Sequence, residues 1–279
     1  MPALLTIARL TLHEAVRRRI LVAAALCGVA FLILFGIAFH FIVLDQPERN
    51  LAEILQRRAI IAAFTLVGLY ATNFLTVMTA VLLPVDTLSG EIASGVMQTI
   101  ASKPIRRSSI VLGKWLGFAM LILGYLVLLA GGVLTFAKLR AGVLPPNLHI
   151  GLPLMMLEAL LLLTVSIAGG TRFSTVTNGV LAFGLYGLAF LGGWVEQIAT
   201  FTNNPTVSTI GTVASLIMPS ESMWQLAAYN MQPPIARAIG AGPFSMFGVV
   251  PTPAMVMWAA GYILVLMAIA LRYFSKRPL

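Results

Sequence analysis

The fold is decided by the stretch Leu83–Trp115, which reads LPVDTLSGEIASGVMQTIASKPIRRSSIVLGKW. Long apolar runs precede and follow it, so we expect a compact connection that is held against one face of a membrane. Its apolar residues recur at helical spacing, which predicts a short amphipathic helix lying along that face. These residues are Ile92, Val96, Met97 and Ile100.

Polar residues define the two ends of this predicted helix. Thr87 or Ser89 is expected to cap its start, and a carboxylate at Glu91 suits the positive end of the helix dipole. Pro104 is expected to end it, because proline cannot continue a helix. Basic residues then lead into the next apolar run: Arg106, Arg107 and Lys114.

The composition identifies the class of protein. Hydrophobic residues make up 59% of the 279-residue chain and charged residues only 10%, with a mean hydropathy of +0.96. These values are typical of an integral membrane protein. The net charge of +9 does not indicate nucleic-acid binding, because the basic residues sit at the ends of apolar runs and form no continuous patch. The single cysteine, Cys27, cannot form an internal disulfide.

We therefore predict an all-α integral membrane protein whose residues 1–279 form a single transmembrane domain. An amphipathic helix is expected over residues 1–19, a cytoplasmic loop over 86–109, and an extracytoplasmic segment with short helices over 195–253. In that last segment, Ser222 to Gln225 fits a capping box. The six transmembrane helices are expected at about 20–44, 59–85, 110–137, 150–170, 175–194 and 254–271.

The distribution of basic residues predicts the orientation. Six spans place both termini on one side, and most of the 18 Lys and Arg residues lie on that side together with the Leu83–Trp115 stretch. The positive-inside rule then puts the N-terminus, the C-terminus and this stretch in the cytoplasm. We expect the protein in the cytoplasmic (inner) membrane of a bacterium.

The same stretch resembles the first cytoplasmic loop of the membrane subunits of type-2 ATP-binding-cassette (ABC) exporters. Val96 stands where that family usually has threonine. The residues that match the family pattern are Glu91, Gly95, Pro104, Arg106, Gly113 and Lys114. The resemblance implies that the loop docks on an ATPase subunit as a coupling helix. The coupling residues would then be Glu91, Gly95, Val96, Met97, Ile100, Pro104, Arg106, Arg107 and Lys114. More loosely, Pro219–Tyr229 resembles permeases of copper-enzyme maturation, of the nitrous-oxide-reductase type.

The resemblance implies a permease subunit that forms the translocation pathway as a homo- or heterodimer, in contact with membrane lipid, and exports its substrate. ATP and Mg²⁺ would be bound by the partner ATPase, with no cofactor or metal on this chain. The sequence agrees, because Gly90–Gly95 has the glycine spacing of a phosphate loop but Val96 and Met97 follow where Lys and Ser/Thr are required. We therefore expect no enzyme activity. A secondary transporter or a non-transporting membrane scaffold remain alternatives.

Polar residues inside the spans admit two interpretations, which are helix packing and a mildly polar pathway. The candidates are Thr65, Thr72, Asn73, Thr76, Thr79, Thr175, Asn178 and Tyr186. Glu158 is an acid well inside a span, where it must be protonated, paired or hydrated, so both a structural hydrogen bond and a proton-coupling role are open. We expect the methionines of the outer segment to fill apolar space rather than bind a soft metal. They are Met218, Met223, Met231 and Met246.

Overall fold

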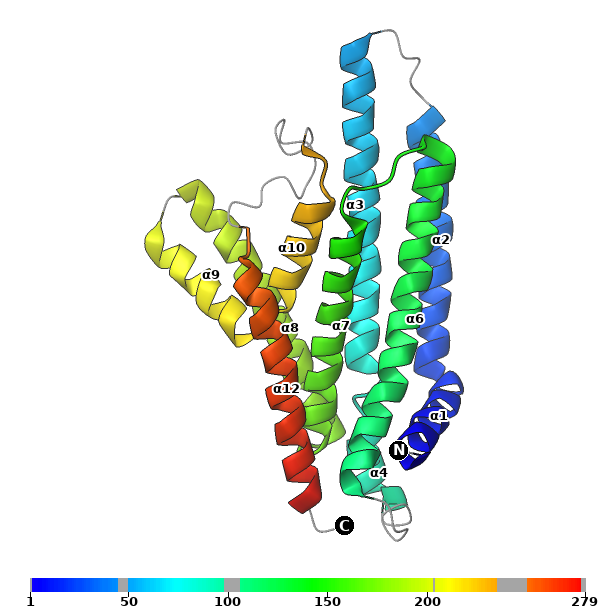
Figure 1. Ribbon diagram of the computed structural model, residues 1–279, viewed down its shortest axis with the longest axis vertical. Coiled ribbons are helices and arrows are strands. Elements are labelled where there is room, and N and C mark those ends of the chain that lie inside the picture. The colour runs from blue at the N-terminus through cyan, green and yellow to red at the C-terminus, as the bar shows by residue number, and fades with distance from the viewer. Residues whose placement is uncertain (1, 45–49, 98–105, 203, 235–249, 277–279) are drawn as a thin grey trace.

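The computed structural model describes residues 2–44, 50–97, 106–202, 204–234 and 250–276. All the regular structure in these ranges is helical, which confirms the predicted fold class (Figure 1). Six helical segments are long and apolar enough to cross a membrane, as predicted. The long helices are α2 (Arg19–Leu44), α3 (Leu51–Leu82), α6 (Arg107–Ala141), α7 (Leu148–Gly170), α8 (Thr175–Thr202) and α12 (Pro253–Lys276).

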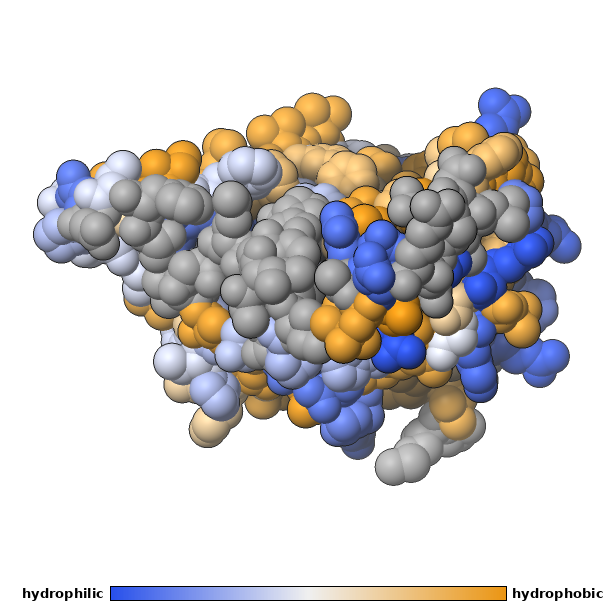
Figure 2. Space-filling model, turned by 90° about the horizontal axis from the view of Figure 1, so that it is seen from above, coloured by the Kyte–Doolittle hydropathy of each residue, from blue (hydrophilic) through white to orange (hydrophobic). Residues whose placement is uncertain are grey.

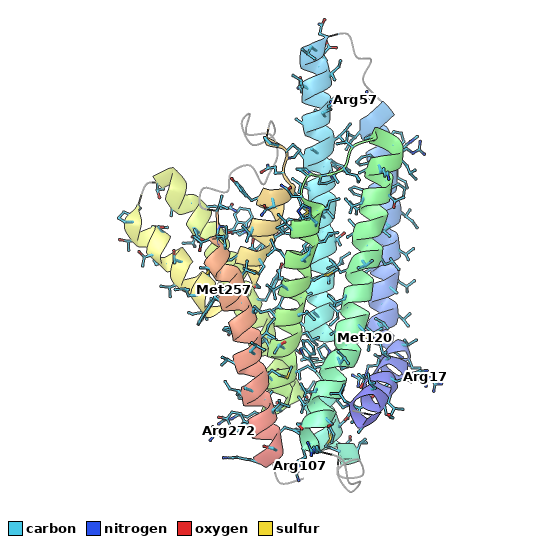
Figure 3. All side chains as sticks on the ribbon, viewed as in Figure 1. Arg17, Arg57, Arg107, Met120, Met257 and Arg272 are labelled. Carbon is cyan, nitrogen blue, oxygen red and sulfur yellow. The ribbon has the colours of Figure 1, made fainter. Side chains whose placement is uncertain are left out.

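The long helices run up and down, so that several connections gather at one end of the bundle (Figure 1). That end carries α1 (Pro2–Val16), α4 (Thr87–Ala93), the turn between α7 and α8, and the end of α12. Arg17, Arg107 and Arg272 all lie there, whereas Arg57 lies at the opposite end (Figure 3). We call the end with α4 the basic end and the end where α3 begins the distal end.

Helix α7 occupies the centre of the bundle. It packs against α3, α6, α8, α10 and α12. Of its most apolar 18-residue stretch, 67% is buried, against 11% for the same length of α2 and 17% for α12. Because α2 and α12 are strongly apolar yet mostly exposed, their outer faces are suited to lipid. The buried centre and the lipid-facing periphery are both apolar, since unpaired polar groups are costly in either environment.

The ends of the helices are set by local sequence and do not coincide with the ends of the apolar runs. Helix α3 begins at Leu51 rather than at the predicted residue 59, because charged residues such as Glu53 and Arg57 continue the helix beyond its apolar part. Helix α6 ends at Gly142, whose φ of 66° is readily adopted by glycine and whose N–H donates to the Lys138 carbonyl.

The segment after α8 folds back into the bundle. Helix α9 (Pro205–Ile217) packs against α8, and α10 (Ser220–Met231) packs against α7. Asn204 caps α9 by accepting from the Thr206 N–H at 3.0 Å, and Trp258 of α12 donates to the Leu216 carbonyl at 3.0 Å. The two helices form a hairpin that descends from the distal end to the middle of the bundle (Figure 1).

The hairpin differs from a surface cap, because α10 is buried. Met223, Trp224 and Met231 have no more than 1% of their surface exposed, as does Met218 at the hairpin turn. Met246 lies outside the described residues. Three of the four outer methionines thus fill the core of the bundle.

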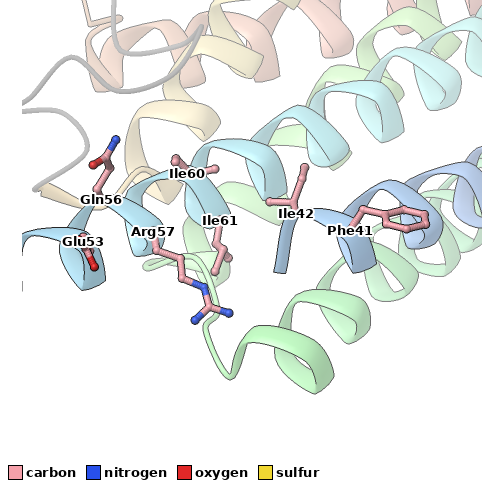
Figure 4. A pocket seen from close by; sticks show the side chains of 7 residues that line it. All are labelled: Phe41, Ile42, Glu53, Gln56, Arg57, Ile60 and Ile61. Carbon is pink, nitrogen blue, oxygen red and sulfur yellow. The ribbon is translucent and has the colours of Figure 1, made fainter. Parts of the chain in front are cut away.

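At the distal end, a cavity of about 410 Å³ opens between α2 and α3 (Figure 4). Its lining combines apolar and charged side chains, namely Phe41, Ile42, Glu53, Gln56, Arg57, Ile60 and Ile61. Figure 2 looks onto this end and shows hydrophilic side chains beside apolar ones. This mixture suits a boundary between lipid and water.

Candidate functional site

The connection from α3 to α4 is built into the bundle. Helix α3 ends at Leu82, and Leu83 and Leu88 on either side of the turn are fully buried. The predicted caps are wrong: Thr87 and Ser89 lie inside α4, and Asp86 occupies the N-cap position without a capping hydrogen bond from its side chain. The Asp86 carboxylate is engaged by α8 instead. Helix α4 is therefore fixed by other helices more than by its own cap.

An ion pair joins α4 to α6. The Lys114 ammonium donates to the Glu91 carboxylate, with 5% of the lysine side chain and 13% of the glutamate side chain exposed. The neighbouring Gly113 faces α1, where a Cβ atom would lie 2.8 Å from the Cβ of Ile7. The Gly-Lys pair thus holds two elements to α6, with the glycine admitting α1 and the lysine binding α4.

Helix α8 contacts the same connection through its first turns. Thr175 donates from Oγ1 to Asp86 Oδ1 at 2.8 Å and lies 2.9 Å from Ser89 Oγ. Asn178 donates from Nδ2 to the Val85 carbonyl at 3.1 Å and to the Ser166 carbonyl of α7 at 2.9 Å. One amide group therefore links the α3–α4 turn, α7 and α8.

Beyond α4 the chain changes direction at Gly95, whose φ is 76°. The next two residues are placed differently: Val96 is 48% exposed, whereas Met97 is fully buried in the core of this chain. Ile100 and Pro104 lie outside the described residues. The expectation that Met97 inserts into a partner is corrected, because its side chain is already covered.

The basic residues that follow are also placed differently from one another. Arg106 is exposed. Arg107 donates from Nη1 to the Ser275 carbonyl of α12 at 3.2 Å. Arg172, in the α7–α8 turn, donates to the Tyr273 hydroxyl at 3.0 Å. The end of α12 is therefore bound by both neighbouring connections.

The family model described as ABC-2 family transporter protein matches residues 5–279. The chain belongs to the ABC-2 transporter family. It is accordingly a permease of an ABC transporter, a class that works with an ABC ATPase subunit. No curated protein matches it, and the finer resemblance to copper-enzyme-maturation permeases stays a prediction.

The predicted pathway residues of this ABC-2 permease lie inside its helix packing. Three hydroxyls donate to carbonyls of their own helix at 2.8 Å, those of Thr65, Thr76 and Thr79. All the candidates on α3 are at least 95% buried, and Tyr186 of α8 is 8% exposed. These residues therefore pack inside the single chain, and the pathway interpretation stays a prediction.

Thr175 and Asn178 bind the connection from α3 to α4, and their place in a pathway stays a prediction. Sequence reasoning missed their partners Asp86, Ser89 and Ser166. A signal was present, since Thr175 and Asn178 lie three residues apart in the first turns of a span whose start is at the same end of the bundle as α4.

Proposed function

We propose that this ABC-2 permease is one half of a dimer, and that separate ATPase subunits drive it at the α4 connection. Those subunits bind and hydrolyse ATP with Mg²⁺, and the dimer exports its substrate. The basic end faces the cytoplasm of a bacterial cytoplasmic membrane, with both termini on that side. The gathering of Arg17, Arg107 and Arg272 at this end supports the orientation.

The observation that carries the proposal is the attachment of α4 to three other helices. Glu91 binds Lys114 of α6, and Asp86 accepts from Thr175 of α8. Asn178 joins the turn before α4 to Ser166 of α7. A displacement of α4 cannot leave α6, α7 and α8 in place, so a force applied there is transmitted to the spans.

The docking surface comprises the exposed groups next to this network. Val96 offers an exposed apolar contact, and Arg106 offers an exposed positive charge just before α6. Buried apolar anchors contribute about 1–3 kcal/mol each at interfaces, whereas charges at the rim mainly set orientation. The side chains of Glu91, Lys114 and Met97 lie inside the protein and hold the residues of the docking surface in position.

The direct test is ATP hydrolysis with and without the partner. The purified chain is expected to hydrolyse no ATP, because its Gly90–Gly95 segment lacks the phosphate-loop lysine. Addition of the ATPase subunit in lipid should give hydrolysis that co-purifies with the permease. Steady hydrolysis by the rigorously purified chain alone contradicts the proposal.

The dimer contact is proposed on the exposed apolar face of α8, where Val176 is 77% and Val180 is 70% exposed. The resemblance to type-2 exporters, in which the fifth span lines the dimer interface, supports this choice. Val176→Cys in a Cys27→Ser background should form an intersubunit crosslink in membranes. Leu34→Cys on α2, also exposed, is the matched control and should not. If only the Leu34→Cys control forms the crosslink, the dimer interface does not lie on this face of α8.

A further inference from the structure

A carboxyl group and an amide group meet in the centre of the bundle with one hydrogen bond between them. Asn73 of α3 donates from Nδ2 to Glu158 Oε2 of α7 at 2.9 Å. Glu158 is fully buried and Asn73 is 3% exposed. Each group keeps one buried oxygen that has no hydrogen-bond partner among the described residues, Oε1 of Glu158 and Oδ1 of Asn73.

A single proton would satisfy both of these oxygens. A carboxylate oxygen and an amide oxygen are both acceptors, so neither can serve the other while Glu158 is ionised. A protonated carboxyl group has an O–H donor, and a carboxylic acid pairs with a carboxamide through two complementary hydrogen bonds. We propose that Glu158 binds a proton at Oε1 and forms a neutral acid–amide pair with Asn73 inside the membrane.

The surroundings of this pair contain a second acid. Helices α7 and α10 run in opposite directions (Figure 1), and Gly151 lies against Met231. Counting seven residues along each helix from that contact places Glu158 level with Trp224, so Glu221 is one turn away. Glu221 is itself 8% exposed and bonds to the Gln225 side chain.

In the described part of the chain, neither Glu158 nor Glu221 forms an ion pair with a lysine or arginine. Two ionised carboxylates without a cation are costly in a buried, apolar region. A proton removes that cost and needs no cavity, whereas a cation such as Ca²⁺ needs six or more oxygen ligands around it.

Helix α8 is shaped to the second acid. A Cβ atom at Gly193 would lie 2.6 Å from Glu221 Cγ and 2.8 Å from Gln225 Nε2. The two carboxyl–amide pairs therefore join α3 to α7 and fill the contact of α10 with α8. The proton is held between α3 and α7, at the level of Trp224 on α10.

Infrared spectroscopy of the purified protein in lipid tests the proposal directly. The spectrum of wild type minus that of Glu158→Gln at neutral pH should contain the C=O stretch of a neutral carboxyl group, shifted on exchange into D₂O. Glu221 is present in both proteins and cancels. A difference spectrum that contains only carboxylate bands shows that Glu158 is ionised and overturns the proposal.

Thermal unfolding provides a second measurement with a matched control. Gln at position 158 can also form two bonds with Asn73, so Glu158→Gln should keep the Tm within about 2 °C, whereas Asn73→Leu should lower it. Glu91→Gln is the control, since Glu91 has the cation Lys114 as its partner, and it should lower the Tm markedly. An equal loss in Glu158→Gln and Glu91→Gln contradicts a neutral Glu158.

Discussion

Lys114 on α6 binds Glu91 on α4 with both side chains almost completely removed from solvent. Glu91 lies in α4, before the turn at Gly95, and Lys114 lies within α6. The ion pair therefore fixes α4 directly to α6. Val96 and Arg106, which follow α4 and precede α6 in the chain, are exposed next to these fixed elements.

Breaking the ion pair between Glu91 and Lys114 should loosen the attachment of α4 to α6. Glu91→Gln leaves the Lys114 ammonium buried without its counter-charge, which should destabilise the protein by about 3 kcal/mol and lower its Tm. Coupled ATP hydrolysis should fall at the same time. The exchanged double variant, Glu91→Lys with Lys114→Glu, should recover part of the Tm. If the exchange recovers nothing beyond the two single variants combined, the pair is not the stabilising element.

Val96 and Met97 should respond differently to the same substitution. Val96→Asp puts a charge on an exposed position, so the permease should fold normally and lose its ATPase subunit in a pull-down. Met97→Asp buries a carboxylate in the core, so it should lower the free energy of unfolding of the permease itself by about 3 kcal/mol or more. Thermal unfolding of the permease without its partner separates the two effects. Full assembly of Val96→Asp with stimulated hydrolysis removes Val96 from the docking surface.

The Thr175 hydroxyl should matter more for coupling than for stability. Thr175→Val deletes the hydrogen bond to Asp86, a loss of about 1 kcal/mol, and leaves α8 bound to the turn before α4 through Asn178. ATP hydrolysis should continue with reduced substrate transport. Thr65→Val is the control, because the Thr65 hydroxyl bonds only within its own helix. Equal transport by the two variants argues against a role for Thr175 in transmission.

Cysteine labelling should distinguish the two helices of the hairpin. In a Cys27→Ser background, Thr206→Cys at the exposed start of α9 should react quickly with a water-soluble maleimide added from outside the cell. Ala227→Cys on α10 should be protected, since Ala227 is fully buried. If Thr206→Cys reacts only after the reagent has reached the cytoplasm, the orientation is opposite to the proposed one. Equally fast reaction at both positions shows that α10 is not packed as described.

The six spans could be predicted because their apolar lengths exceed what a soluble helix needs. Their ends could not, since residues such as Glu53 and Arg57 extend α3 beyond the hydrophobic region without a change in helical geometry. The short apolar pieces after α8 were correctly expected to be helices. That α10 lies inside the bundle depends on contacts with α7, which no local pattern reports.

The candidate site was predictable only in part. The motif drew attention to Glu91 and Lys114, but their pairing depends on how α4 lies against α6. Helical periodicity places Thr65, Thr76 and Thr79 on one face, yet it does not say whether a neighbour or a pathway covers that face. The same limit applied to Met97, whose spacing matched an exposed apolar stripe although its side chain is buried.

Helix α12 is held at both of its ends by residues of other helices. Trp258 donates to the Leu216 carbonyl of the hairpin, and the Ser275 carbonyl accepts from Arg107 beside the loop. These two positions are 17 residues apart, or about 26 Å along a helix. Because a continuous helix resists stretching, α12 links the basic end to the turn of the hairpin in the middle of the bundle. A pull at the basic end thus reaches the hairpin along the edge of the bundle, bypassing its packed centre.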